Sequence, residues 1–477
     1  MSVAFGDEDS QKHSLKCNML HLYDDLPDEV DNITDMFSQG IFYGRLRLNS
    51  FGFRWKEEII KDDGTKKRVN HAVGAVGGSM IWKSAVLNGF SIGAGAYMAQ
   101  SFGSLDSEEA TLYKAGKGVL SRYDVLTEDV EYMAVLAQAY LQYTHQDTSF
   151  KAGRQIFESF LTRSNDTKMI PNTFEGITLH SKVIPDTSLK MAYFTKQKLR
   201  DHSDFHHLLA TGELIDNQPE ELFTQNDDSA MHFGLQLSKL QARGIDDNLI
   251  VIEAKNESVE NLTLTMNYTA VPDLISSAMI QADYRFYMGG LSIIPGLRYM
   301  QQFDDGAGEI GGANLKSNTE GYNDPDSLDT ELYAARVDIV EDAFKLRFGY
   351  TKVADKGDIL APWRGFPTAG FTRAMAQYNW YANTESYMAQ LDYEFEMIPE
   401  FKIISRFVIQ DFDDEKLGVQ ADSNVFTIDL LKGLGEGPLY LKTRYAHVMG
   451  DDNTVFGNVI KADPSYDELR LEINYLF

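Results

Sequence analysis

The sequence predicts an all-β fold, a transmembrane antiparallel β-barrel of about 18 strands, and three observations support it. Apolar and polar side chains alternate in many short segments, as in the final one, 467–477 (DELRLEINYLF). Such a strand has one oily face and one charged face, and a closed barrel leaves it no exposed edge. Short and long joins alternate between these segments. No apolar run of about 18 residues is present, so we expect no membrane-spanning helix.

The composition argues against a nucleic-acid-binding protein. The 477 residues carry a formal net charge of −27, whereas a nucleic-acid-binding surface needs a basic footprint. A single cysteine, Cys17, cannot form an internal disulfide, and we expect a free thiol in a flexible tail. The first residues lack the basic, apolar and small-residue succession of a signal peptide. We therefore expect no nucleic-acid partner.

The chain is predicted to contain two parts. Residues 1–40 are expected to form a polar tail and a short helix on the periplasmic side, and residues 41–477 the barrel. The tail proper, 1–25, is expected to be mobile. The helix is predicted within DNITDMFSQG, with Asp31 as its cap and Gly40 at its end. So short a helix should dock against another element.

The joins between predicted strands sort by length. Tight turns are expected at 87–89, 146–148, 185–187, 288–290, 341–342, 398–400 and 433–437. Long joins are expected at about 56–69, 104–129, 158–173, 199–229, 304–327, 354–383, 413–422 and 450–466. This asymmetry is typical of outer-membrane barrels, which have short periplasmic turns and long extracellular loops. Segment 230–243 is assigned to a folded outer loop or to an extension of the next strand, because another strand would break the even count.

Basic residues gather on the strand faces that should line water. Arg45 and Arg47 share one face of their strand, which is unusual in a packed core and natural beside water. By alternation the inner faces carry Arg45, Arg47, Arg285, Arg298, Arg336, Arg347, Lys402, Arg406, Lys442, Arg444 and Arg470. Such a column would draw carboxylates or phosphates along a channel by electrostatics and fork-like hydrogen bonds.

Acidic residues are expected to face this column: Asp283, Asp338, Asp392, Glu394, Glu396 and Glu472. A lumen with both signs of charge would orient a zwitterionic solute. The same residues could instead pair with one another and brace the wall, and we expect both roles.

The third long join, 157–175 (FESFLTRSNDTKMIPNTFE), is predicted to fold inward and narrow the pore. It mixes apolar and charged residues, whereas a purely external loop would be more polar; a loop on the outer rim is the alternative. The predicted constriction residues are Phe160, Arg163, Asp166, Lys168, Phe174 and Glu175.

The sequence assigns no catalytic residue, cofactor or metal ligand. His202 and His206 could bind a metal if they shared a helix face, but solvated loop histidines are the simpler interpretation. One rival hypothesis is a barrel enzyme with a Ser–His pair on its lipid face, involving His145 or His180, although no G-x-S-x-G elbow is present. Another is a soluble extracellular glycan-binding β-protein.

Three segments of the chain resemble the OprD family of outer-membrane porins: DNITDMFSQGIFYGRLRL, KAGRQIFESFLTRSNDTKMIPNTFEGITL with the preceding strand AYLQYTHQDTSF, and LSIIPGLRYMQQFDDG. The resemblance covers nearly the whole chain, and the GRQ to NTFEG block is its most specific part. It implies an eighteen-stranded monomeric barrel with the third outer loop as a constriction. It also implies a basic ladder, with Arg154 beside Arg45, Arg47 and Arg298, that guides small carboxylate-bearing solutes by facilitated diffusion.

The resemblance also implies the surroundings of the chain. We expect the outer membrane of a Gram-negative bacterium, contact with its lipid and lipopolysaccharide, and small anionic or zwitterionic solutes. The terminal Phe477 resembles the signal read by the outer-membrane assembly machinery. Amino acids, aromatic acids, dicarboxylates and phosphates fit such a ladder equally well.

Overall fold

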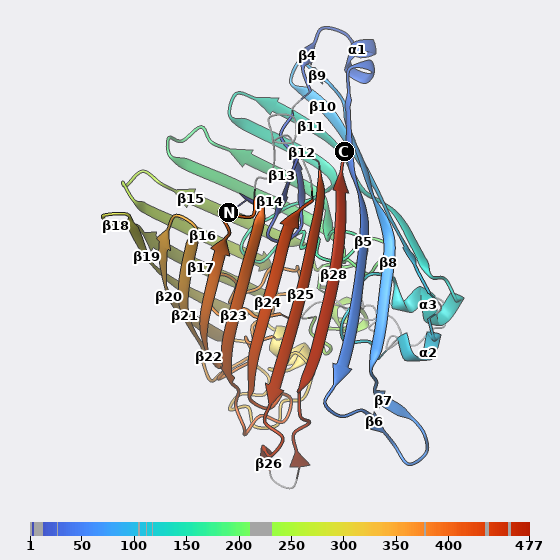
Figure 1. The fold of residues 1–477 in the computed structure, drawn as a ribbon, viewed down its shortest axis with the longest axis vertical. Coiled ribbons are helices and arrows are strands. Elements are labelled where there is room, and N and C mark those ends of the chain that lie inside the picture. The colour runs from blue at the N-terminus through green and yellow to red at the C-terminus, as the bar shows by residue number, and fades with distance from the viewer. Residues whose placement is uncertain are drawn as a thin grey trace.

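The computed structural model describes residues 2–3, 13–25, 27–103, 105–110, 112–116, 118–209, 231–375, 378–434, 438–456 and 459–477. Within these residues, 18 long antiparallel strands form one closed barrel (Figure 1). The long strands are β5 (Ile41–Trp55), β8 (His71–Lys83), β10 (Phe90–Ser101), β11 (Tyr132–His145), β12 (Thr148–Gln155), β13 (Thr173–Ser181), β14 (Thr187–Lys198), β15 (Leu249–Asn256), β16 (Leu262–Val271), β17 (Ile275–Tyr284), β19 (Leu291–Asp304), β20 (Thr330–Glu341), β21 (Phe344–Val353), β22 (Glu385–Glu394), β23 (Phe401–Asp411), β24 (Ser423–Gly433), β25 (Leu439–Gly450) and β28 (Tyr466–Leu476).

The barrel closes by pairing its last strand with its first. In this antiparallel pair, Glu472 of β28 lies opposite Asn49 of β5. The terminal residue completes the seam, because the Phe477 amide donates to the Gly44 carbonyl at 3.1 Å. The apolar edge that the sequence of β28 would expose is therefore paired, as predicted.

Alternation along the strands produces two different surfaces. Leu46, Phe348, Phe407 and Leu471 are exposed on the outer surface. Their immediate neighbours in sequence, such as Arg47, face the interior. An outer band of exposed apolar side chains is the surface that hydrocarbon solvates. Among the described residues, no helix is long and apolar enough to cross a bilayer.

The joins sort by length between the two ends of the barrel, with one exception. Tight turns use residues that tolerate positive φ, such as Asn88 (φ 50°) and Gly89 (φ 84°) between β9 (Val86–Leu87) and β10. Long loops connect the strands at the opposite end. The exception is 272–274, which joins β16 to β17 at the loop end and was not predicted.

Residues 231–243 belong to a loop, which agrees with one of the two alternatives predicted for 230–243; residue 230 lies outside the described residues. This part of the loop contains the short helix α5 (Leu237–Ala242) rather than a barrel strand. The remaining loop elements are α2 (Ser107–Ala110), α3 (Arg122–Glu128), α6 (Ala307–Gly311), β6 (Ile59–Ile60), β7 (Lys66–Arg68), β26 (Val455–Phe456) and β27 (Val459–Ile460). The short strand β18 (Phe286–Met288) belongs to the barrel sheet, where it pairs with β19.

The predicted short helix is present as α1 (Ile33–Ser38), but its cap differs from the prediction. Asn32, not Asp31, caps it, since the Asn32 side chain accepts from the Asp35 amide at 2.9 Å. The cap at the other end is Gln39. The helix docks on the turn end of the barrel, where the ring of Phe37 stacks on that of Trp82. It follows β4 (Glu29–Val30), which pairs in parallel with β9.

The described part of the N-terminal segment is a hairpin inside the barrel and not a free tail. β2 (His13–Lys16) pairs with β3 (His21–Tyr23), and β1 (Ser2–Val3) pairs with β2. Leu15 and Met19 pack against Tyr440 and Leu476, which face inward from β25 and β28. Cys17 is exposed and forms no disulfide, but it lies between β2 and β3 of this hairpin and not in the flexible tail that was predicted. The composition of the hairpin is mixed, so its sequence alone did not distinguish a docked segment from a solvated one.

Candidate constriction inside the barrel

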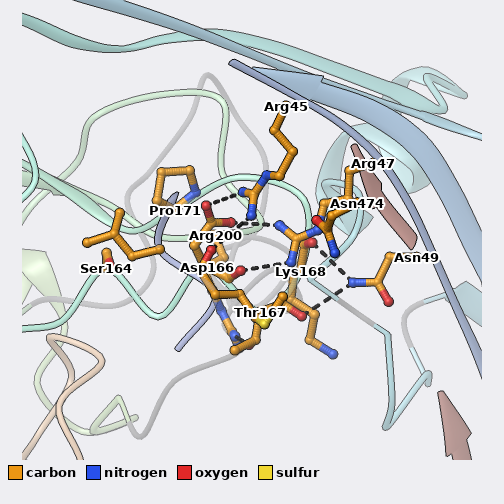
Figure 2. Close-up of polar contacts among 12 residues, drawn as sticks. Arg45, Arg47, Asn49, Ser164, Asp166, Thr167, Lys168, Pro171, Arg200 and Asn474 are labelled. Carbon is orange, nitrogen blue, oxygen red and sulfur yellow. Dashed lines mark hydrogen bonds and ion pairs between the residues drawn. The ribbon is translucent and has the colours of Figure 1, made fainter. Parts of the chain in front are cut away.

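The densest group of charges joins the first strand to the loop between β12 and β13. Arg45 and Arg47 project inward from β5, and both guanidinium groups contact Asp166 of that loop (Figure 2). The distance from Arg47 Nη1 to Asp166 Oδ1 is 2.8 Å. Arg47 also donates through Nε to Oε1 of Glu472 on β28, at 3.0 Å. Two cations and two carboxylates therefore compensate one another.

This cluster, formed by Arg45, Arg47, Asp166 and Glu472, is closed to water. The side chains of Arg45 and Arg47 are 1% and 0% exposed. A second nitrogen of Arg45, Nη1, donates to the Met19 carbonyl of the N-terminal hairpin at 2.8 Å. Removing one partner of a buried pair costs about 3–5 kcal/mol, because the other charge stays buried and uncompensated. The cluster thus fixes both the loop and the hairpin to the wall, which is the bracing role expected alongside solute contact.

The loop 156–172 folds into the lumen, as predicted. The Phe160 amide donates to Glu253 Oε2 of β15 at 2.6 Å, and the Lys168 ammonium lies 4.0 Å from the centre of the Phe51 ring. Asn49 holds the loop backbone as well, with Nδ2 3.1 Å from the Lys168 carbonyl oxygen (Figure 2). Arg163 is partly exposed near Glu158. Contacts on two walls therefore suspend this loop across the interior.

A second inward loop, 354–384, covers the opposite part of the lumen. The two loops meet where the Gly365 amide donates to the Leu161 carbonyl at 2.9 Å. On the wall, Arg298 Nη1 donates to the Pro367 carbonyl at 2.6 Å, and Arg336 Nη1 donates to the Gly370 carbonyl at 2.9 Å. The sequence located this loop but gave no sign that it folds inward.

The wall formed by β19 to β25 carries paired cations that keep some contact with solvent. Arg347 makes a two-pronged bond to Asp338, with both distances 2.6 Å. Asp429 accepts from Arg444 and from Arg406, the latter at 3.1 Å. The Arg406 and Arg444 side chains are 22% and 19% exposed. Their guanidinium groups therefore retain surface that a solute could reach.

The structure places most of the predicted column on inner faces. These residues are Arg45, Arg47, Arg298, Arg336, Arg347, Lys402, Arg406, Lys442, Arg444 and Arg470, whereas Arg285 lies between β17 and β18, outside both strands. Among the acidic residues, Asp283 pairs with Arg336 at 2.7 Å, Asp338 pairs with Arg347, and Asp392 accepts from Gln390 at 2.6 Å. Solute contact by these side chains stays a prediction.

Two predicted site residues point the wrong way. Arg154 lies on the same face of β12 as Phe150, which is exposed on the outer surface, whereas Lys151 and Gln155 face inward. Its partner is Glu175 of β13, directly opposite, at 3.1 Å. Both residues therefore belong to the outer surface and not to the ladder or the constriction. Alternation in KAGRQ did not fix the direction of Arg154 because glycine and alanine leave the two faces alike.

Phe174 is interior but belongs to the wall. It lies on β13, where its ring stacks on Phe194 with 4.7 Å between centroids. The predicted constriction loop therefore ends before Thr173, where β13 begins.

Several interior charges were not predicted. Asp429 was missed, although a single acid on the inner face of an otherwise apolar strand (FTIDLL) is a usable signal. Lys151, Lys190 and Lys345 also face inward from β12, β14 and β21. At the start of the inward loop, Glu158 Oε2 accepts a hydrogen bond from Lys16 Nζ of the hairpin at 3.1 Å. Contacts of this last kind join segments far apart in the chain, so no local pattern shows them.

Two carboxyls in the inward loops have shifted pKa values. Burial would raise the pKa of Glu158, but Arg163 and Lys16 together lower it below its ordinary value. Burial raises the pKa of Asp358 to about 6, although the Leu315 and Ala382 amides donate to it. The Tyr322 hydroxyl also donates to Asp358, at 2.7 Å. Asp358 is thus a buried connection between its own loop and the loop 305–329.

The histidines of the loop after β14 are not solvated, contrary to the simpler interpretation of the sequence. His202 and His206 are buried with their ring centroids 4.4 Å apart, and they lie outside any helix. His207 Nδ1 lies 2.9 Å from Asp247 Oδ1. No group of three or more potential metal ligands occurs among the residues the structure describes.

Comparison with known proteins agrees with this architecture. A family model described as outer membrane porin, OprD family, matches residues 89–477. No curated protein matches the chain in sequence. Among solved structures, Pseudomonas aeruginosa OpdK with vanillate is 14% identical, with a TM-score of 0.67 over 91% of this chain and 98% of that chain.

Two further solved structures are similar to the same extent. Pseudomonas aeruginosa OccK9 (OpdG) is 17% identical with a TM-score of 0.67, over 91% of this chain and 98% of that chain. Acinetobacter baumannii OccAB3 is 15% identical with a TM-score of 0.68, over 91% of this chain and 99% of that chain. At these identities the structural likeness shows the fold alone.

Proposed function

Because the chain belongs to the OprD family of outer-membrane porins, we propose that it gives facilitated diffusion to small carboxylate-bearing solutes. One observation carries the choice of solute: the inner wall from β20 to β28 presents guanidinium groups that keep solvent contact although each is paired. They belong to Arg336, Arg347, Arg406, Arg444 and Arg470, whose side chains are between 11% and 22% exposed.

A paired but accessible guanidinium suits transport better than a free one. A carboxylate passing the wall can exchange with Asp338 or Asp429 for one prong of the fork, so binding is weak and reversible. Several such sites in series allow entry without trapping. The solved structure of OpdK with vanillate, an aromatic carboxylate, agrees with a solute of this class. The buried Arg45 and Arg47 are left out of this path.

An enzyme is the weaker alternative, although one contact resembles a catalytic pair. His180 Nε2 lies 3.1 Å from Ser188 Oγ. Both side chains lie on inner faces, whereas the rival hypothesis required the lipid face. The charges acting on His180 come from Lys190, Lys182 and Lys151. Three cations oppose the imidazolium that a general base must become, so this pair is poorly suited to activate a serine.

The proposal is tested by removing charge from the accessible wall. In the Arg347→Gln, Arg444→Gln double variant, Asp338 keeps its ion pair with Lys345 (3.3 Å), and Asp429 keeps its ion pair with Arg406. Neither carboxylate is therefore left without a cation. We expect the half-blocking concentration of benzoate in planar-bilayer recordings to rise about tenfold, the size of roughly 1.4 kcal/mol. Arg154→Gln is the matched control, because it removes the same charge from the outer surface. Equal block in the wild type and the double variant would contradict the proposed path.

A further inference from the structure

A groove of about 540 Å³ lies on the outer surface of the barrel, where the last strand pairs with the first. Its lining includes Gly52 and Arg54 of β5, Asn70 just before β8, Tyr445 of β25 and Leu469 of β28. The four strands lie side by side (Figure 1), and these residues are near the loop ends of their strands. The groove is outside the wall, so it takes no part in the proposed path through the lumen.

Strand register explains why the surface is hollow here. One outward row runs from Tyr445 to Leu469, Gly52 and Ala72 on four neighbouring strands. The side chains become small at Gly52, where an added Cβ would meet no described atom within 4 Å. Leu469 is 55% exposed and forms an apolar side of the groove. The groove therefore opens onto the apolar band that hydrocarbon solvates.

A polar row lies directly beside this apolar row, on its loop side. It contains His447, Asp467 and Arg54, which oppose one another on β25, β28 and β5. His447 Nδ1 lies 2.8 Å from Asp467 Oδ1, so the carboxylate of this row already has a polar neighbour. Arg54 is exposed, and Asn70 is held nearby because its Oδ1 accepts from the Trp55 amide at 2.7 Å. A guanidinium and an amide group thus border the apolar groove.

Outward tyrosines place the two rows at a membrane–water interface. Toward the loop ends of other strands, the rings of Tyr299 and Tyr333 lie 5.3 Å apart, and those of Tyr350 and Tyr387 lie 5.1 Å apart. Tyr445 occupies a corresponding position on β25 and is 37% exposed. Tyrosine rings gather where hydrocarbon meets lipid head groups. The apolar groove is therefore at the depth of acyl chains, and the polar row is at the depth of head groups.

The chemistry of the two rows defines one kind of ligand. The groove volume falls within the roughly 300–1,000 Å³ of ligand sites, and its apolar lining suits an acyl chain. The guanidinium of Arg54 suits a phosphate, which arginine binds through paired hydrogen bonds. The long loops of an outer-membrane porin face the cell exterior, and the leaflet on that side consists of lipopolysaccharide. Its lipid A carries both acyl chains and phosphates.

We propose that this groove binds the lipid A of lipopolysaccharide, with one acyl chain against Gly52 and Leu469 and one phosphate at Arg54. The bound lipid lies across β25, β28 and β5, and so across the strand pair that closes the barrel. This inference goes beyond the proposed function, because it assigns a partner to the outer surface and not a solute to the lumen.

The test is a titration of the full chain, refolded in detergent, with lipid A, followed by native mass spectrometry. We expect Gly52→Trp to weaken lipid A binding by about tenfold or more, because the indole fills the groove. Ala389→Trp is the matched control, since it adds the same ring to an exposed outward position on β22, away from the groove. Its affinity should equal that of the wild type.

A second variant tests the phosphate contact. Arg54→Gln should weaken lipid A binding by about tenfold or more, whereas Arg154→Gln, which removes an arginine from the outer surface of β12, should leave it unchanged. Lipid A without its phosphates should bind the wild type as weakly as intact lipid A binds Arg54→Gln.

Three results would overturn the assignment. The first is equal affinity for lipid A in the wild type and in Gly52→Trp or Arg54→Gln. The second is phosphatidylglycerol binding as tightly as lipid A, which would give the groove to any phosphorylated lipid. The third is a dimer in the mass spectrum that Gly52→Trp dissociates, which would give the groove to a second copy of the chain. If Gly52→Trp fails to fold, as shown by loss of heat-modifiable gel migration, Arg54→Gln carries the expectation alone.

Discussion

The two sides of the lumen hold arginines on equivalent inner faces but in different environments. On β5, Arg45 and Arg47 are fully enclosed by the inward loop and by the hairpin, and their charge is matched by Asp166 and Glu472. On β21, Arg347 is paired just as closely but stays accessible. The arginines on the two strands are the same residue type and lie on equivalent faces. They differ in what covers them. The segments that fold inward, and not the positions of the arginines along their strands, therefore decide which cations a solute can contact.

The largest expected effect on stability comes from removing the Asp166 carboxylate, which compensates both enclosed arginines. In Asp166→Asn, Arg45 and Arg47 keep Glu472 as their one carboxylate partner, together with the Met19 carbonyl and the backbone carbonyl of residue 166, inside a site closed to water. We expect the free energy of unfolding to fall by about 3–5 kcal/mol. Urea unfolding of the refolded barrel in detergent measures it.

A matched control uses an exposed pair on the same barrel. Glu257→Gln breaks the exposed pair with Lys255, and such pairs contribute less than about 1 kcal/mol. Similar losses of stability for Asp166→Asn and Glu257→Gln would show that the cluster is solvated and would contradict the enclosure of Arg45 and Arg47.

The loop covering the accessible wall offers a smaller, pH-dependent test. The pKa of Asp358 in the folded protein is raised to about 6, above its ordinary value of 3.8. The folded state therefore binds the proton more tightly than the unfolded state. Its contribution to stability is complete below about pH 4 and is lost as the pH rises through 6, by at most about 3 kcal/mol.

Limited proteolysis of loop 354–384 measures this effect. The loop should resist cleavage better at pH 5 than at pH 8, and Asp358→Asn should remove most of the difference between the two values. A loop that becomes more resistant as the pH rises would reverse the sign and refute the assignment of Asp358 as the responsible group.

The sequence predicted the barrel and the faces of its strands well because alternation is a local property. Except for Arg154, each ladder residue that lies in a barrel strand was assigned to the correct face by counting along its own strand, whereas Arg285 lies between two strands. Arg154 failed because the neighbouring Gly153 and Ala152 do not distinguish the two faces. The register between β12 and β13 places Glu175 directly opposite Arg154, so the two residues pair on the outer surface.

What covers the lumen could be predicted only in part: the inward fold of the third long loop was expected, but its contacts, the N-terminal hairpin and the second inward loop were not. The contacts of Arg45 with Asp166 and Met19 join positions far apart in the chain, and a loop with a few apolar residues can lie inside or on the rim. The same holds for the N-terminal hairpin, whose mixed composition suits a solvated tail as well as a docked segment. Packing between distant segments, rather than local pattern, fixes these parts of the site.

The central claim is that charge on the accessible wall selects carboxylates, and matched current-block measurements test it most directly. Benzoate and benzyl alcohol have similar size and differ in charge. Single-channel recordings of the wild-type protein should show block by benzoate at concentrations at least tenfold below those needed for benzyl alcohol, with the preference lost in the Arg347→Gln, Arg444→Gln variant. Equal block by the two compounds, or a preference that survives in that variant, would contradict the account.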